Sequence, residues 1–184
     1  MIERLQTPQA ARVWCAEQRA AGRTLGFVAT MGCLHEGHLN LVRAARASND
    51  VVVVSVFVNP LQFGPSEDYS SYPRSRRQDL DLLSEEGIDG VYLPDEKALY
   101  PEGFTTLVSV KGLGDSLEGE NRPGHFAGVA TVVLKLIHSV EPDLLVLGQK
   151  DAQQALIIRT MVLDLNWPLQ IEVCPTVREA DGVA

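Results

Sequence analysis

The chain has 184 residues, 45% of them hydrophobic and 22% charged, and it carries a formal net charge of -8. This length and composition are typical of one globular domain, or one domain with a small appendage, and they exclude a disordered chain. The acidic balance argues against non-specific binding of nucleic acid or anionic membranes, because such binding needs an excess of cationic side chains.

Neither a membrane-spanning segment nor a secretory signal is expected from the apolar pattern. The longest uninterrupted apolar stretches, such as 51–54, fall far short of the roughly 20 residues that span a bilayer. The N-terminus has no apolar signal core. The cysteines, Cys15, Cys33 and Cys174, lie far apart and form no CxxC pair. This favours reduced thiols in a cytoplasmic protein.

The first half of the chain alternates between helical and strand patterns. Thr7 and Pro8 are typical of an N-cap and a first helical turn, and Gly22 is typical of a helix end. Apolar β-branched runs favour buried strands, and apolar residues at helical spacing favour helices. In chain order we expect a helix at 8–21, a strand at 25–29, a helix around 39–45 and a strand at 51–58.

The second half continues this alternation after a long polar loop. In chain order we expect a helix around 80–87, a strand at 91–93, an edge strand at 104–110, a loop at 112–124, a helix around 129–137, a strand at 144–147, a helix at 151–165 and a strand at 169–174. Strands that alternate with helices predict an α/β fold with a parallel, doubly wound sheet. Ligands of such sheets bind outside the carboxyl ends of the strands, so the loops there hold the candidate residues.

The segment 30–38, which follows a predicted strand and opens a predicted helix, is the first candidate site. A helix N-terminus with nearby glycines, here Gly32 and Gly37, favours phosphate. His35 and His38 are three residues apart, so both can face the helix entrance and donate hydrogen bonds to phosphate oxygens. Structural histidines and a metal pair are the alternatives, but the spacing is not that of an HExxH zinc site.

Two further strand ends carry polar side chains. Lys150 follows the strand at 144–147 and suits a phosphate, although a surface lysine beside the N-cap Asp151 has the same pattern. Asn59 and Gln62 follow the strand at 51–58 and can hydrogen-bond a small polar substrate. A proline turn that satisfies its own backbone is the alternative there.

Cationic and acidic side chains elsewhere are weaker candidates. The segment 121–126 combines Arg122 and His125 with a helix start, which also fits a capped turn. The basic run at 72–77 fits a solvated face. Asp79 can help to hold a metal through water, although an exposed helical aspartate is the default interpretation.

Taken together, these segments resemble the pantothenate synthetase (pantoate–β-alanine ligase) family. The matching motifs stand in the family's order and cover essentially the whole chain. They are TMGxLHEGH at 30–38, VSVFVNPLQFGPSEDYSSYPR at 54–74, LEGENRPGHFAGVATVV at 117–133, GQKDAQQ at 148–154 and PTVREADGVA at 175–184.

The resemblance implies a Rossmann-like fold of the HIGH-motif nucleotidyl transferase superfamily and a ligase that forms an amide bond in two steps. Pantoate attacks the α-phosphate of ATP to give pantoyl adenylate and pyrophosphate, and the amine of β-alanine then displaces AMP. Mg²⁺ accompanies the ATP. The family is usually a homodimer, and the segment 104–110 is a candidate contact. The net acidic charge and the short apolar stretches imply no membrane or nucleic-acid partner.

The resemblance also assigns roles to individual residues. The catalytic residues are His35, His38 and Lys150. The residues that bind ATP are Met31, His38, Gly148, Lys150, Asp151 and Val177, with Asp151 at the ribose and Val177 at the adenine. The residues that bind pantoate are Gln62, Gln154, Met31, Asn59 and Tyr72, and Asp79 lies on the metal side.

The chain departs from the family pattern at three points. Ala29 replaces a usual proline, and Gln149 replaces a usual glutamate beside Lys150. The family pattern continues past Ala184 with a Ser-Ser-Arg-Asn segment and a smaller domain that closes over the site. We therefore expect residues 1–184 to be the N-terminal domain that binds nucleotide and pantoate, with reduced or no turnover because a transition-state donor is missing.

Two other functions remain open at this point. A HIGH-motif nucleotidylyltransferase leaves the nucleotide on its product and needs no amine. A nucleotide-binding module that has lost its chemistry keeps only the fold.

Overall fold

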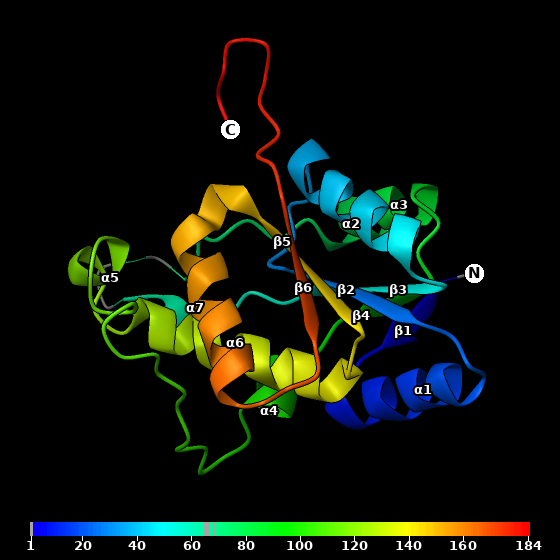
Figure 1. The fold of residues 1–184 in the computed structure, drawn as a ribbon, viewed down its shortest axis with the longest axis horizontal. Helices are drawn as coiled ribbons and strands as arrows, with labels where there is room; N and C mark the ends of the chain where they lie inside the picture. Colours follow the sequence, from blue (N-terminus) through cyan, green and yellow to red (C-terminus); the bar gives the residue numbers. More distant parts are fainter. Residues whose placement is uncertain (1, 65–66, 68) are drawn as a thin grey trace.

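A computed structural model describes residues 2–64, 67 and 69–184, and its described part is built on one parallel sheet (Figure 1). The six strands lie in the order β1-β4-β3-β2-β5-β6. Their bounds are β1 Glu3–Leu5, β2 Leu25–Thr30, β3 Val51–Val56, β4 Gly90–Tyr92, β5 Leu144–Gly148 and β6 Gln170–Cys174. Every pair of neighbouring strands is parallel.

Helices connect the strands in the alternation that the sequence predicts. The α-helices are α1 Pro8–Ala20, α2 Glu36–Ser48, α3 Arg76–Glu85, α4 Glu96–Leu99, α5 Glu118–Asn121, α6 His125–Val140 and α7 Ala152–Asp164. Two 3₁₀ turns are η1 Pro60–Gln62 and η2 Gln149–Asp151. Thr7 caps α1 as expected, because its side chain accepts a hydrogen bond from the Ala10 amide at 3.1 Å.

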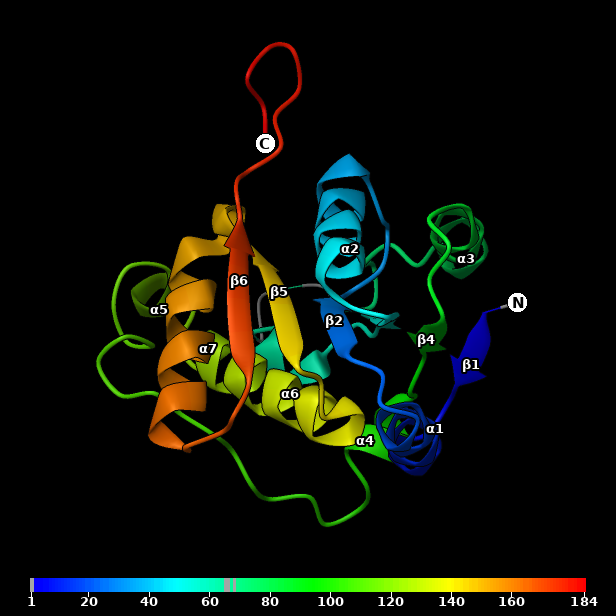
Figure 2. The ribbon, with the colours of Figure 1, turned by 45° about the vertical axis from the view of Figure 1, so that its right-hand side comes forward.

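The sheet is covered on both faces, which confirms the doubly wound prediction (Figure 2). Adjacent side chains of one strand point to opposite faces. Phe27 of β2 therefore packs into a core with α1, α6 and α7, and Val28 packs into a second core with α2 and α3. All four leading valines of β3 are buried, as a strand covered on both faces requires.

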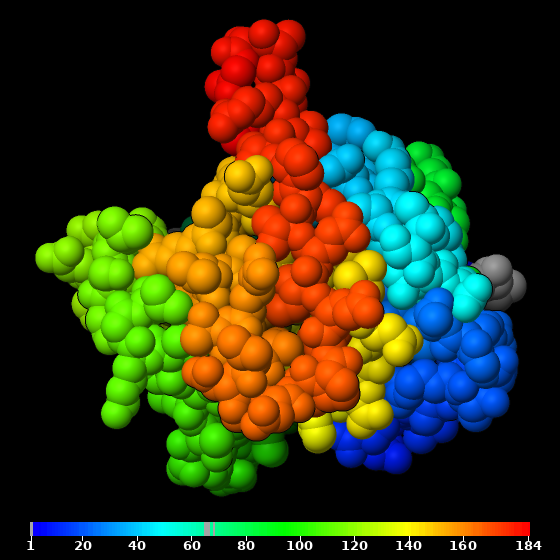
Figure 3. Space-filling model, viewed as in Figure 1, coloured from blue at the N-terminus to red at the C-terminus, as the bar shows by residue number. Residues whose placement is uncertain are grey.

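The chain order creates a crevice between β2 and β5. From β2 the chain winds outward through β3 to β4, and then returns to the other side of β2 as β5. The connections after β2 and β5 therefore diverge, and such a switch point is where doubly wound sheets bind ligands. The segment 175–184, which follows β6, projects from the body above this same end of the sheet (Figure 3).

The predicted edge strand at 104–110 is wrong. This segment is extended, but it forms no part of the sheet, whose edges in the described chain are β1 and β6. The amide of Val108 instead donates to the Thr131 hydroxyl on α6 at 2.9 Å. Val108 and Val110 pack on the core beside that helix, so their alternation reflects helix packing rather than strand pairing.

Three short elements were not expected from the sequence, namely β1, α4 and α5, the last of which lies in the segment 112–124 that was expected to be a loop. Three residues of strand and four of helix are too short to show a hydrophobic period. Among the described residues, we find no helix with the length and apolar character needed to cross a bilayer.

Candidate active site

The loop after β2 is held in a fixed shape by side chains on three elements. The Thr30 hydroxyl donates to the Ser55 carbonyl at 2.8 Å and accepts from the Gly32 amide at 3.2 Å. Gly32 has a φ of +86°, which glycine adopts without strain, and Cys33 has a φ of +50°, which costs energy for any side chain. The loop therefore needs outside support.

Asp79 supplies much of that support from α3. Its carboxylate accepts hydrogen bonds from the amides of Cys33 at 3.2 Å and Leu34 at 2.8 Å. The Ser75 hydroxyl donates to it at 3.2 Å. Asp79 is only 2% exposed, so the default interpretation of a solvated helical aspartate is wrong. Its burial follows from this role, since a carboxylate leaves water only where donors surround it.

His35 and His38 form a capping box at the start of α2. Nδ1 of His35 accepts from the Gly37 amide at 3.2 Å, and Nδ1 of His38 accepts from the His35 amide at 3.4 Å. A ring nitrogen that accepts carries no proton, so each neutral ring carries its proton on Nε2. The two rings lie 4.1 Å apart, centroid to centroid. The pair therefore presents two Nε2–H donors side by side at a helix N-terminus.

His38 is held neutral by its surroundings. Burial is the main cause that lowers its pKa from 6.5 to about 4, and the neighbouring His35 lowers it further. A neutral ring at neutral pH keeps Nδ1 free to cap the helix while Nε2–H remains a donor. Charge for an anion must then come from elsewhere in the site.

Lys150 supplies a cation to the same cleft. A cavity of about 550 Å³ is lined by His35, His38, Gly148, Lys150, Asp151 and Val177. His35 and His38 come from the start of α2, Gly148 from the end of β5, Lys150 and Asp151 from η2, and Val177 from the segment after β6. The sequence predicted these residues separately, and the structure brings them together at the switch point.

A second, smaller cavity adjoins the first. It has a volume of about 150 Å³, and the apolar part of its wall is formed by side chains of α6, by Ala29 of β2, by Leu147 of β5 and by Phe57 after β3. Gln62 of η1 and Gln154 of α7 are two of its three side-chain amides, and Asn59 is the third. Within the described part of the chain, the side-chain amide of Gln154 has no hydrogen-bond partner. The side-chain amide of Gln62 donates only to the Met31 sulfur at 3.2 Å, and it accepts from Asn59 at 3.1 Å. Both amides keep capacity for a ligand.

Asn59 lines this cavity, but its amide is fully engaged by the protein. Its Nδ2 donates to Gln62 and to the Gly128 carbonyl, each at 3.1 Å. Its Oδ1 accepts from the Leu61 amide at 3.3 Å and from the Tyr100 hydroxyl at 2.7 Å. Four partners saturate an asparagine side chain. Asn59 therefore braces the turn that carries Gln62, and its contact with pantoate stays a prediction.

Four residues line both cavities, namely Met31, His38, Tyr72 and Asp151. The cavities therefore adjoin each other at these four residues. A ligand in the larger cavity and a ligand in the smaller one would come into contact at this junction.

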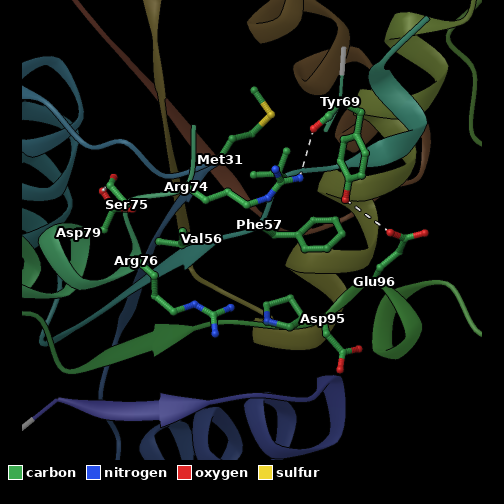
Figure 4. A pocket seen from close by; sticks show the side chains of 12 residues that line it. Met31, Val56, Phe57, Tyr69, Arg74, Ser75, Arg76, Asp79, Asp95 and Glu96 are labelled. Atoms are coloured by element: carbon green, nitrogen blue, oxygen red, sulfur yellow. Dashed lines mark hydrogen bonds between the residues drawn. The ribbon is translucent and has the colours of Figure 1, made fainter. Parts of the chain in front are cut away.

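A third cavity of about 230 Å³ lies on the other side of Met31 and Phe57 (Figure 4). Arg74 and Arg76 of the basic run line it together with Asp79, so this run is not simply a solvated face. Arg74 is tied to the chain by its bond to the Tyr69 carbonyl at 3.2 Å.

Within the described residues, no group of three or more His, Cys, Asp or Glu side chains could hold a metal ion. The Asp79 carboxylate already accepts three hydrogen bonds and lines the third cavity rather than the cleft of Lys150. Magnesium is usually held by one or two carboxylates together with substrate phosphates and water. Asp79 therefore does not fit a protein site for Mg²⁺.

Comparison with known proteins gives a consistent answer. The family model described as pantoate-beta-alanine ligase matches residues 3–184. The chain belongs to this family. Pantothenate synthetase of Moorella thermoacetica is 54% identical over 183 residues, which cover 100% of this chain and 65% of that relative. The chain thus spans about two thirds of the length of this relative.

Solved structures of the family superpose closely. The pantothenate synthetase of Thermus thermophilus matches with a TM-score of 0.89 and 51% identity, over 98% of this chain and 64% of that one. The Francisella tularensis ligase, solved as a complex with a βγ ATP ligand and β-alanine, matches with a TM-score of 0.92 and 39% identity, over 100% of this chain and 70% of that one. The Rossmann-like fold expected from the HIGH motif is therefore confirmed.

The sequence alone missed the residues that brace the site. Asp79 reaches Cys33 across 46 positions, and Arg122 reaches Gln62 across 60 positions. No local spacing signals such contacts. The sequence pattern also did not indicate the role of Gly128. This glycine allows η1 to approach α6, since a Cβ there would lie 2.2 Å from the Leu61 carbonyl oxygen.

Proposed function

We propose that the chain binds ATP and pantoate and carries the first half of an ATP-dependent ligation that forms pantothenate. The larger cavity holds ATP, and the smaller one holds pantoate. The observation that carries this proposal is that the two cavities adjoin and that His38 lines both. Residues 1–184 form the nucleotide- and pantoate-binding domain in this account.

Charge neutralisation is the task of the larger cavity. When a carboxylate oxygen of pantoate attacks the α-phosphorus, the bond to the pyrophosphate oxygen breaks and negative charge moves onto the pyrophosphate. The Nε2–H donors of His35 and His38 and the ammonium of Lys150 are placed to stabilise that charge. Asp151 faces the ribose, and Gly148 and Val177 line the nucleotide.

Positioning is the task of the smaller cavity. Its apolar walls suit the gem-dimethyl group of pantoate, with Met31 beside it, and Gln62 and Gln154 suit the hydroxyl and carboxylate groups. Tyr72 closes the junction between the two ligands. Alignment of two bound reactants removes the entropic cost of bringing them together.

The second half of the reaction follows from the same placement. The β-alanine amine attacks the acyl carbon of the adenylate, the bond from that carbon to the AMP oxygen breaks, and the nitrogen loses a proton. Mg²⁺ would enter bound to the ATP phosphates. A homodimer, a cytoplasmic location and a reduced turnover of this chain stay predictions.

Calorimetric titration tests the proposal without requiring turnover. We expect wild-type protein to bind pantoate and ATP, and Gln154→Ala to weaken pantoate about 10- to 150-fold, the range for one hydrogen bond to a charged group. ATP affinity should change less than about twofold. Gln78→Ala, an exposed amide on α3, is the matched control and should change neither. Absence of pantoate binding in the wild type would refute the proposal.

A product assay separates the ligase from a nucleotidylyltransferase. With pantoate, ATP and β-alanine, a ligase releases AMP and pyrophosphate and requires the amine for release of AMP. A nucleotidylyltransferase would retain the nucleotide on its product and would ignore the amine. A module that has lost its chemistry would bind ligand and release neither product.

A further inference from the structure

Gln62 is anchored through its backbone by a group of residues that lies outside both cavities. Its carbonyl oxygen accepts from Nδ1 of His125 at 2.8 Å and from Nη2 of Arg122 at 3.3 Å. The two donors come from the start of α6 and the end of α5, about sixty positions further along the chain. The side chain of the same Gln62 lines the smaller cavity.

The hydrogen-bond partners fix the protonation of His125. A carbonyl oxygen can only accept, so Nδ1 of His125 must carry the proton. Arg122 can only donate, and its Nη1 lies 3.2 Å from Nε2 of His125, so Nε2 must accept. His125 is therefore a neutral ring with the proton on Nδ1, the opposite tautomer to His35 and His38.

Glu67 closes the group on its other side. Its carboxylate accepts two bonds from Arg122, from Nε at 2.6 Å and from Nη2 at 3.0 Å. It also accepts from the Gly64 amide at 2.7 Å. The bond to Arg122 is the main cause that lowers the pKa of Glu67 to about 2. The bidentate ion pair orients the guanidinium toward the Gln62 carbonyl.

Close packing against α6 also fixes the position of η1, the turn that carries Gln62. A Cβ at Gly128 of α6 would lie 2.2 Å from the Leu61 carbonyl oxygen and 2.8 Å from the Gln62 nitrogen. Asn59 ties the turn to the Gly128 carbonyl. The turn thus packs against Gly128 of α6 and is held through the Gln62 carbonyl by His125, at the start of the same helix, and by Arg122.

We propose that Glu67, Arg122 and His125 form a clamp that positions Gln62 for pantoate. We name these three the Gln62 clamp. They are positioning residues, because Arg122 and His125 hydrogen-bond the backbone of Gln62, Glu67 holds Arg122, and the three line neither cavity. This inference rests on the proposed function, since it assumes that the smaller cavity takes pantoate.

The clamp acts on one ligand and not on the other. Among the described residues, no hydrogen bond joins His35, His38 or Lys150 to the clamp, so ATP affinity should not depend on it. Loss of the His125 bond would free the Gln62 carbonyl and let the amide leave its position. A structural role alone would instead lower the stability and weaken both ligands together.

Two isosteric substitutions of His125 test the clamp. The amide nitrogen of asparagine takes the place of Nδ1, and that of glutamine takes the place of Nε2. We expect His125→Gln to weaken pantoate about 3- to 10-fold, the range for one uncharged hydrogen bond, with ATP affinity unchanged. His125→Asn should retain the bond and stay within about twofold of wild type. His138→Asn, at the exposed far end of α6, is the control.

A double-mutant cycle shows whether the effect passes through Gln62. In a Gln62→Ala background the His125→Gln change should have no further effect on pantoate affinity, because the amide that it positions is gone. Glu67→Gln gives a second route if a His125 variant fails to fold, and it should also weaken pantoate selectively.

The outcomes separate the two proposals. If wild-type protein binds pantoate and the His125→Gln and His125→Asn variants bind it equally, the clamp is overturned and the proposed function stands. Equal weakening of ATP and pantoate would also overturn it. If wild-type protein binds no pantoate, the proposed function fails, and the clamp fails with it.

Discussion

Asp79→Asn should destabilise the fold through the loop that carries the histidines. Asparagine keeps one oxygen in place of two, so its nitrogen would face either the Cys33 amide or the Leu34 amide, both of which donate to the carboxylate. One hydrogen bond to a charged group contributes about 1.5–3 kcal/mol, and a buried donor without a partner costs about 1–3 kcal/mol. We therefore expect the free energy of unfolding to fall by about 3 kcal/mol.

Urea unfolding measures this change, and the slope with denaturant should stay constant. Asp81→Asn is the matched control, because Asp81 lies exposed on the same helix. We expect it to change the stability by less than about 0.5 kcal/mol. If Asp79→Asn is no more destabilising than Asp81→Asn, the loop does not depend on this carboxylate, and the argument for a braced site is wrong.

Three further changes follow from the same structure. Ser55→Ala should be neutral or stabilising by up to about 1 kcal/mol in urea unfolding, because the buried Ser55 hydroxyl has no partner among the described residues. Gly128→Ala should cost about 1–3 kcal/mol and weaken pantoate, since its Cβ would overlap the Leu61 carbonyl. A crystal structure of the variant with η1 unmoved would contradict this. The lowered pKa of His38, about 4 against 6.5, means that the unfolded chain binds more protons between those pH values. The free energy of unfolding should therefore rise with pH across that window, by up to about 3 kcal/mol. His38→Gln should lose this dependence.

The sequence predicted those helices and strands that are indicated by a residue pattern within the element itself. The valines of β3 and the cap at Thr7 are local features, and the structure confirms both. The segment 104–110 misled the prediction because an alternating pattern also arises where an extended chain packs on a helix such as α6. Strand β1 is too short to show any pattern and depends on pairing with β4.

In the candidate site, too, local patterns were predictable from the sequence and contacts between distant segments were not. His35 and His38 were predictable because their spacing places both rings at one helix entrance. Asp79 and Asn59 were assigned to ligands, yet their polar atoms are engaged by backbone and side chains from distant segments. Which polar side chain faces a ligand and which braces the site depends on contacts between segments, and those contacts leave no signal in local spacing.

The most direct test of the account is ¹⁵N NMR of the imidazole rings, with labelled histidine and stepwise addition of ATP. From the hydrogen-bond partners of each ring, we expect His35 and His38 to carry their proton on Nε2 and His125 to carry it on Nδ1. ATP should shift the Nε2 resonances of His35 and His38 and leave His125 unchanged. If ATP does not shift the Nε2 resonances of His35 and His38, or if these rings carry the proton on Nδ1, then the two histidines do not hold the phosphates of ATP as proposed.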